Sequence, residues 1–399
     1  MRSPTPDASW SRIDAGAQTA PASALVFKAH HGLAGLEHLN LEWTRLVESM
    51  PAGARFNQLP GWYRAYLASG ACDPASVWFV AAYRNEQLVA ICPLQFQQRR
   101  VPLLRPRFLG TLDGDELQLS DFAFAPVADN GLLLHELTRW LRAQRMLRWD
   151  VLRLVKVSDD SSLGYAAKVQ APSFMIASDY DASAYFDTSG TYDQATRAMS
   201  SKMRSNLRRR TRLAENSASL RFESCRQPED VARAFDIFLE LESSGWKGPS
   251  GKMSSIRCRP SILAFYSEVV REFKARNECV INLLWHGEDA IAAQLGLHVG
   301  RTFYILKVGY LAANQTLAPG ILLQDRTIRH ACEHPEVDML SMVNDPHWLH
   351  GFKANTVRVW LYYVPNWSVQ GLLAHLGIWL KRLRSAPAPK SDAVSVPDA

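Results

Sequence analysis

The sequence has few cysteines and no long apolar run. Its six cysteines are scattered over 399 residues without a CxxC pair, so neither a disulfide framework nor a cysteine-rich zinc site is expected. The most apolar window, residues 361–380, is interrupted by Pro365 and several polar residues, which argues against a membrane-spanning helix. These features predict a cytoplasmic protein with reduced thiols.

Three signatures of common enzyme classes are also missing. The chain contains no GxSxG, no GxxxxGK(S/T) and no GxGxxG, which argues against α/β-hydrolases, P-loop nucleoside triphosphatases and dinucleotide-binding enzymes. An HxxEH pattern runs from His330 to His334, but Pro335 follows at once. The two histidines therefore stand at a fraying helix end, no third ligand accompanies them, and we expect no metal.

Length predicts two domains, because 399 residues exceed one ordinary core. We expect a disordered tail over residues 1–24, without the apolar centre of a signal peptide. A first lobe over 25–190 and a second over 217–365 would be joined by a basic helix over 191–216. Residues 366–399 would form a final helix and a Pro/Ala/Ser-rich tail.

The basic helix carries much of the net charge of +6. Met199, Met203 and Leu207 recur every four residues and predict a packed side, while Arg and Lys surround the rest. Three interpretations stay open. The helix is a solvated connector, a face for phosphate or an acidic carrier protein, or an RNA contact; the last is disfavoured because no aromatic residues are interleaved for base stacking.

Residues 290–332 hold the clearest local pattern. The apolar segments 290–299 and 302–311 are separated only by Gly300-Arg301, which predicts an antiparallel hairpin. Pro319-Gly320 then opens a predicted helix over 321–332. A glycine at a helix entrance leaves room beside unpaired backbone N–H groups, and the helix dipole favours an anion there, so we expect a pyrophosphate at this point.

An internal duplication is also predicted. Residues 83–90 (YRNEQLVA) align with 285–292 (WHGEDAIA), and each segment bridges the strands of a predicted hairpin. The order of predicted elements around the two segments is similar. We therefore expect two lobes of related α+β architecture.

Several polar residues near these elements are candidates for chemistry. Glu242, Trp246 and Lys247 lie in a Gly-rich loop, and Asp345 and Lys353 lie in a loop rich in His and Trp. On the second hairpin, Tyr310 could protonate a leaving thiolate, and Gln294 or Lys307 could hold a carbonyl or a carboxylate. Packing roles for the same residues stay open from the sequence alone.

Taken in succession, these motifs resemble a known family. Trp246-Lys247-Gly248, residues 290–297 (AIAAQLGL), Pro319-Gly320 with the leucines that follow, and Phe352-Lys353 are similar to GNAT-type acyltransferases of the CelD/BcsL, cellulose-biosynthesis-like class. That class is related in fold to Fem-type aminoacyltransferases. The resemblance implies two tandem GNAT-like lobes with the active site in the second.

The resemblance also implies an activity, namely acyl transfer from acyl-CoA, or an acyl carrier protein, to an amine or hydroxyl acceptor in envelope or exopolysaccharide synthesis. Glu242 would deprotonate the acceptor and Tyr310 would protonate the thiolate. The donor would be bound by Lys307, Pro319, Gly320, Ile321 and Leu322, and the acceptor by Trp246, Lys247, Gln294, Asp345 and Lys353.

Two alternatives stay open. The first is a Fem-type transferase that uses aminoacyl-tRNA, although nucleic acid is the weaker expectation. The second is a non-catalytic scaffold of a polysaccharide-synthesis complex, docked on a partner or on anionic lipid by the C-terminal helix, residues 367–384.

Overall fold

A computed structural model describes residues 24–50, 53–97, 99, 104–125, 130–169, 171–249 and 251–385. The predicted tails over 1–24 and after 385 therefore lie outside the described residues, apart from residue 24. The first half contains β1 (Val26–His31), α1 (Gly32–Glu48), α2 (Pro60–Ala68), β2 (Val77–Arg84), β3 (Gln87–Gln97), β4 (Phe108–Gly110), β5 (Ala123–Phe124), α3 (Asn130–Ala143), β6 (Val151–Ser158), α4 (Ser162–Val169) and β7 (Ile176–Asp187).

The second half begins with the predicted basic segment. It contains α5 (Tyr192–Ala198), α6 (Ser201–Glu215), β8 (Leu220–Cys225), α7 (Pro228–Glu242), α8 (Pro260–Lys274), β9 (Cys279–His286), β10 (Asp289–Val299), β11 (Thr302–Tyr310), α9 (Pro319–Glu333), β12 (Met339–Ser341), β13 (Asn355–Pro365) and α10 (Val369–Ser385). The α+β class predicted from the sequence is confirmed.

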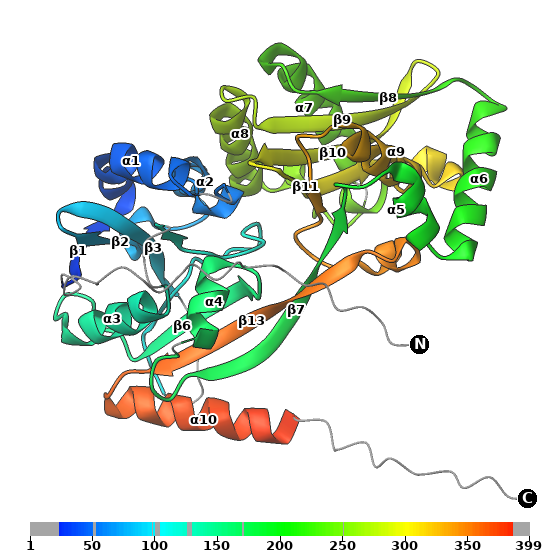
Figure 1. Cartoon of the computed structure of the whole chain (residues 1–399). Helices are drawn as coiled ribbons and strands as arrows, with labels where there is room; N and C mark the ends of the chain where they lie inside the picture. The colour runs from blue at the N-terminus through cyan, green and yellow to red at the C-terminus, as the bar shows by residue number, and fades with distance from the viewer. Residues whose placement is uncertain are drawn as a thin grey trace, which may run out of the picture.

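Within the described residues, one 13-stranded sheet runs through both halves, in the order β1-β2-β3-β4-β6-β13-β7-β12-β11-β10-β9-β8, with β5 on β3. The two halves repeat one pattern, since four antiparallel strands end in a parallel pair, β4 with β6 and β11 with β12. Hairpins β2–β3 and β9–β10 occupy equivalent places (Figure 1). This repetition agrees with the predicted duplication.

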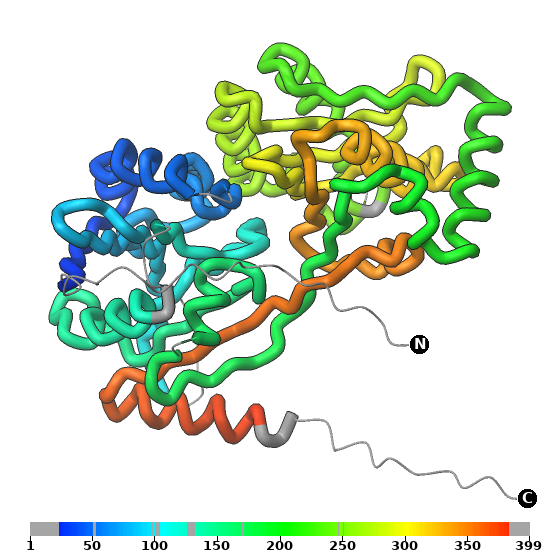
Figure 2. The backbone as a smooth tube through the Cα atoms, in the orientation of Figure 1, coloured from blue at the N-terminus to red at the C-terminus, as the bar shows by residue number. Residues whose placement is uncertain are grey.

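The central strands are exchanged between the halves. β7 leaves the first half and pairs with β12, whereas β13, the last strand of the chain, pairs with β6. The two also pair with each other along most of their length (Figure 2). The sequence prediction ends the first lobe at residue 190, which assigns β7 to that lobe, and it assigns β13 to the second lobe over 217–365. Both interpretations miss this exchange, because an apolar pattern identifies a strand without identifying its neighbour.

The single helix predicted over 191–216 is wrong in one respect. The first helix, α5, ends at Ala198. Ser200 has an extended backbone and caps the second helix, α6, because its hydroxyl accepts the backbone N–H of Met203. An N-cap serine competes with continuous helix, which explains the break. The predicted packed side is confirmed, because Met199, Met203 and Leu207 are buried.

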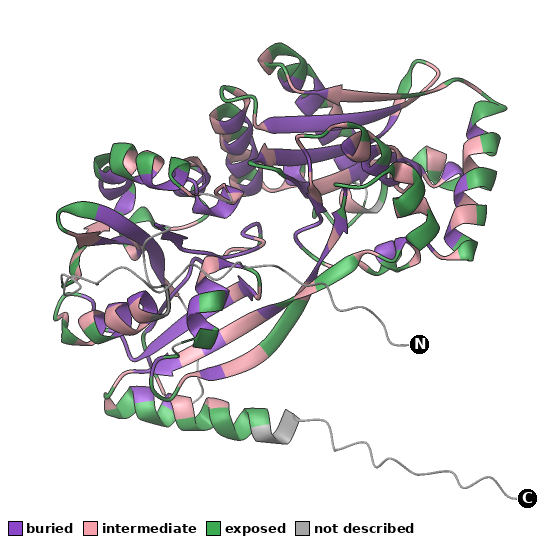
Figure 3. Ribbon diagram, in the orientation of Figure 1, coloured by how far each residue is buried: buried purple, intermediate pink, exposed green. Residues whose placement is uncertain are grey.

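Aromatic side chains fasten the two halves to each other. The Phe56 ring meets the Tyr304 ring edge-on at 4.8 Å between centroids, and Trp62 meets Phe265 at 5.1 Å. Phe56, Trp62 and Phe265 are almost fully buried. Buried residues line the other strands of both halves and the inner sides of α2 and α8, whereas residues 179–181 of β7 and residues 355, 356 and 358 of β13 are exposed (Figure 3). The large apolar area removed from water stabilises one relative placement of the lobes.

Candidate functional site

The site begins where β11 and β12 separate. The two strands pair in parallel from Thr302 with Met339 to Tyr304 with Ser341, and β11 then continues alone on that side to Tyr310. In the first half the equivalent gap is closed. There the Thr111 hydroxyl accepts the backbone N–H of Val155 at 2.8 Å, and Ser120 pairs with Val157. Only the second half therefore keeps an opening between its parallel strands within the described residues.

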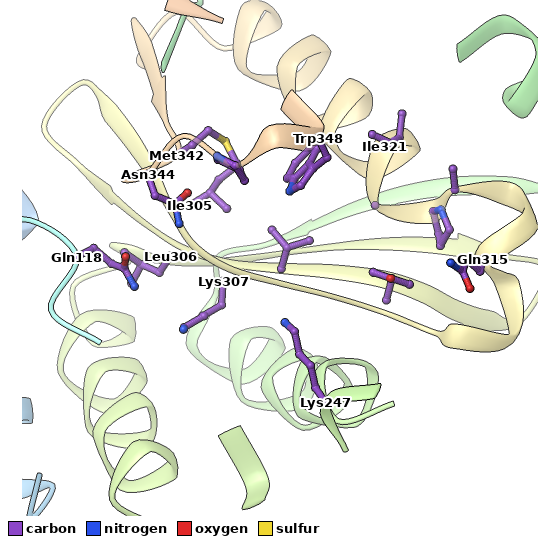
Figure 4. A pocket seen from close by; sticks show the side chains of 16 residues that line it. Gln118, Lys247, Ile305, Leu306, Lys307, Gln315, Ile321, Met342, Asn344 and Trp348 are labelled. Carbon is purple, nitrogen blue, oxygen red and sulfur yellow. The ribbon is translucent and has the colours of Figure 1, made fainter. Parts of the chain in front are cut away.

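A cavity of about 650 Å³ occupies this opening. Figure 4 shows the side chains that surround it, including Lys247 and Lys307 on one side and Asn344 and Trp348 on the other. Its wall is mixed in chemistry, with aliphatic strand residues, two lysines, amides and an indole. The lining residues are Gln118, Lys247, Ile305, Leu306, Lys307, Val308, Tyr310, Gln315, Ala318, Pro319, Gly320, Ile321, Met342, Asn344, Pro346 and Trp348.

The entrance of α9 forms one end of the cavity. Ala318 precedes the helix in the left-handed conformation, with φ 53° and ψ 56°. Its carbonyl accepts the N–H groups of Ile321 and Leu322 at 3.0 and 3.2 Å. Pro319 has no N–H, so the first-turn donor left for a ligand is that of Gly320. The sequence predicts several free backbone N–H groups at the start of this helix, but the structure leaves one, that of Gly320. The helix dipole adds to its attraction for an anion.

Tyr310 stands beside this entrance. A Cβ built on Gly320 would meet only Tyr310 Cδ1, at 3.9 Å. Within the described residues, the Tyr310 hydroxyl has no hydrogen-bond partner. Its backbone is fixed, because Ser244 Oγ donates to the Tyr310 carbonyl at 2.7 Å. The main chain of Tyr310 is therefore fixed, and the residue lines the cavity.

Lys307 is held by a carboxylate from the other lobe. Its Nζ lies 2.8 Å from Glu116 Oε2, and Tyr266 Oη donates to the same oxygen at 2.6 Å. Glu116 is 6% exposed and Tyr266 is fully buried. Burial and the neighbouring Glu116 carboxylate raise the pKa of Tyr266 well above its ordinary value, so the phenol stays protonated and donates. Lys307 is thus oriented by an interaction between the lobes.

Replacing Glu116 tests this link. We expect Glu116→Ala to lower the free energy of unfolding by about 2 kcal/mol, because it leaves a buried hydroxyl without an acceptor and an amine without its counter-ion. Glu116→Gln retains an acceptor for Tyr266 and should lose less. Urea unfolding of both variants measures the difference, and an alanine variant as stable as the glutamine variant would contradict the role assigned to Tyr266.

Glu242 and Lys247 lie together, as predicted, but only Lys247 lines the cavity. Glu242 is 4% exposed; its Oε2 accepts the N–H of Ile256 at 2.8 Å, and its Oε1 lies 3.5 Å from Lys247 Nζ. The backbone of Trp246 lies in the short helix Gly245–Lys247, while its side chain is outside the described part of the structure. The predicted base therefore sits behind Lys247 rather than at the surface of the cavity.

Gln294 is not among the residues that line the cavity. It is fully buried; its Nε2 donates to Gln324 at 2.9 Å and its Oε1 accepts from Thr327 at 2.7 Å. Both partners belong to α9, so Gln294 fastens that helix to the sheet. A binding role for this residue conflicts with its position, because both of its polar groups are already used.

The structure separates three further predicted residues from the cavity wall. Leu322 is 1% exposed and packs in the core under α9. Asp345 lies 3.7 Å from His350, and Lys353 is exposed at the end of the short helix His347–Phe352. Neighbours that the sequence did not single out line the cavity instead, namely Gln118, Asn344 and Trp348. The predicted residues that the cavity does bring together are Lys247, Lys307, Tyr310, Pro319, Gly320 and Ile321.

Two features are absent from the residues that the structure describes. No group of three or more His, Cys, Asp or Glu side chains is arranged to hold a metal ion. No helix in that part of the chain has both the length and the apolar character needed to cross a membrane.

Comparisons with known proteins agree with this geometry. Residues 201–347 match a family model described as an acetyltransferase (GNAT) domain. No curated protein sequence matches the chain. The crystal structure of FemX superimposes with a TM-score of 0.56 at 11% identity, over 88% of this chain and 99% of that one.

Two other solved structures are similar over most of their length. L-PGS from Bacillus licheniformis gives a TM-score of 0.50 at 12% identity, covering 87% of this chain and 96% of that chain. A tandem GNAT protein from the clavulanic acid biosynthesis pathway gives 0.45 at 14% identity, covering 86% and 99%. The GNAT fold and the relation in fold to FemX are confirmed, whereas the cellulose-biosynthesis-like class stays a prediction.

Proposed function

We propose that the protein transfers an acyl group from acyl-CoA, with acetyl-CoA as the first candidate, to an amine or hydroxyl acceptor. The observation that carries the proposal is the gap between β11 and β12, which opens onto a cavity bordered by Tyr310 and the entrance of α9. The family match over residues 201–347 supports the acyl-transfer chemistry. The setting that we propose is cell-envelope or exopolysaccharide synthesis.

The residues present fit such a donor. The N–H of Gly320 and the dipole of α9 would meet the pyrophosphate. On the side of β11 that faces β12, backbone N–H groups beyond Tyr304 have no partner strand, and they would polarise the thioester carbonyl. All six cysteines lie in the described part of the chain and are unpaired, which is consistent with the proposed cytoplasmic location.

The transfer would proceed directly, without a covalent enzyme intermediate. The acceptor nitrogen or oxygen attacks the thioester carbonyl, the bond from carbon to sulfur breaks, and Tyr310 gives its proton to the sulfur. Lys247, paired with Glu242, and Lys307, paired with Glu116, lie on one side of the cavity. We assign the holding of the acceptor to the two lysines, and the uptake of its proton to the carboxylates that are paired with them.

Calorimetric titration of the full chain with acetyl-CoA and with free CoA tests the proposal. We expect saturable binding of both, together with a higher melting temperature, because a ligand that binds only the folded state stabilises it. If the protein binds neither acetyl-CoA nor free CoA, the transferase proposal is wrong and the non-catalytic scaffold is favoured.

A second candidate, transfer from aminoacyl-tRNA, is favoured by one observation. The exposed side of α6 carries Arg208, Arg209 and Arg212 next to one another, with Ser205, Leu213 and Asn216 beside them. If tRNA binds there, its affinity should fall steeply between low and physiological salt, and Glu at all three arginine positions should lower it by about tenfold or more. Filter binding measures the affinity for tRNA at each salt concentration. Absence of tRNA binding would exclude this second candidate function.

A further inference from the structure

The last helix presents an apolar stripe to solvent. In α10 the side chains of Leu372, Leu376 and Trp379 are 46%, 49% and 46% exposed. At 100° per residue they share one side of the helix with Val369, Leu373 and Leu380, which are exposed too. Figure 3 shows this helix exposed along most of its length. Exposed apolar side chains are normally scattered, so an aligned group marks a contact surface.

The opposite side of α10 packs on the protein. Ala374 is buried, and a Cβ on Gly371 would lie 2.4 Å from the carbonyl oxygen of Asp150. The start of the helix is fixed as well, because Ser368 Oγ donates to Asp150 at 2.6 Å and accepts the N–H of Gly371 at 3.0 Å. The small residues Gly371 and Ala374 therefore set the orientation of α10, and the apolar stripe on the opposite side of the helix faces solvent.

The charges around the stripe have one sign. The sequence of α10, VQGLLAHLGIWLKRLRS, contains no acidic residue and ends with Lys381, Arg382 and Arg384. At its beginning, Trp367 is exposed, with the Arg142 guanidinium over its ring at 4.6 Å and the Phe174 ring edge-on at 5.5 Å. Apolar residues flanked by cations and interfacial aromatics match a bilayer surface that carries anionic headgroups.

We propose that α10 docks the protein on anionic membrane surfaces, lying in the plane of the headgroups with its apolar stripe in the acyl boundary. The 17-residue helix is about 25 Å long. A second copy of the chain fits the surface less well, because it would bring more cations and no carboxylate from this helix. The proposal stands on α10 alone and does not depend on the transferase assignment.

Vesicle co-flotation of the full chain tests the proposal. We expect binding to phosphatidylcholine vesicles that contain phosphatidylglycerol, weaker binding to phosphatidylcholine alone, and loss of the difference at high salt. The double variant Leu376→Glu with Trp379→Glu should bind about tenfold more weakly or worse. Lys381→Glu with Arg382→Glu should remove the preference for anionic lipid while the apolar stripe stays intact.

Leu41→Glu is the matched control, because Leu41 is an exposed leucine on α1; this variant should float like the unmodified chain. Equal flotation of the double variant and the unmodified chain would overturn the proposal. So would failure of the unmodified chain to float, or light scattering that shows a dimer which the double variant dissociates. Unchanged melting temperatures would show that the substitutions act on the surface alone.

Discussion

Gly320→Trp is expected to abolish donor binding and to lower kcat/KM by about a thousandfold or more, because an indole would fill the space beside the α9 entrance where the pyrophosphate is proposed to bind. The structure indicates that the fold would tolerate the change. A Cβ at this position meets only the Tyr310 ring, at 3.9 Å, and Gly320 does not adopt a positive φ. The added side chain would extend from the cavity wall rather than into the core.

Gly320→Ala is the matched control for this experiment. Its single methyl group fits in ordinary van der Waals contact, so CoA should still bind to it. Calorimetry with CoA measures both variants, and unfolding curves check that both remain folded. A tryptophan variant that binds CoA like the alanine variant would show that the donor does not use this entrance, and the proposed site would then be wrong.

Tyr310→Phe is expected to slow turnover by about a hundredfold or more while leaving CoA affinity unchanged, because it removes only the proton donor proposed for the leaving sulfur. Release of free thiol from acetyl-CoA, measured across a panel of amines and alcohols, gives the rate. The structure supports a selective effect, since the Tyr310 main chain is fixed by Ser244 and does not depend on the hydroxyl.

The leaving group supplies an internal check on this role. A more acidic thiol leaves as a thiolate without needing a proton from Tyr310. The rate of the Tyr310→Phe variant should therefore fall less with a thioester of such a thiol than with acetyl-CoA. Tyr165→Phe, an exposed tyrosine on α4, serves as the control and should not change the rate. An equal loss with both thioesters would assign Tyr310 to packing or to positioning of the donor.

The parts of the site that could be predicted from the sequence rest on local chemistry. Gly300-Arg301 forms the two-residue turn between β10 and β11, with φ 60° at Gly300, and Pro319-Gly320 starts α9. Such signals depend on backbone conformation within a few residues. They predict that Tyr310, at the end of the second hairpin strand, lies close to the helix entrance.

The parts that could not be predicted depend on contacts between distant segments. Glu116 meets Tyr266 across 150 positions of the chain, and nothing in the polar loop around Glu116 indicates its partner. Gln294 shows a different difficulty. Strand periodicity predicts that successive side chains of β10 alternate between the two faces of the sheet. It does not identify which face packs against α9, so the contact of Gln294 with that helix could not be predicted.

The exchange of β7 and β13 has a consequence for how the chain is made. During translation the first half emerges complete except for the strand that belongs beside β6, and that strand, residues 355–365, is the last of the sheet to leave the ribosome. Until then β6 and β7 present unpaired edges, which are hazards for aggregation. A fragment limited to residues 201–347, the part that matches the acetyltransferase (GNAT) model, would lack both central strands, so we do not expect that fragment to fold on its own.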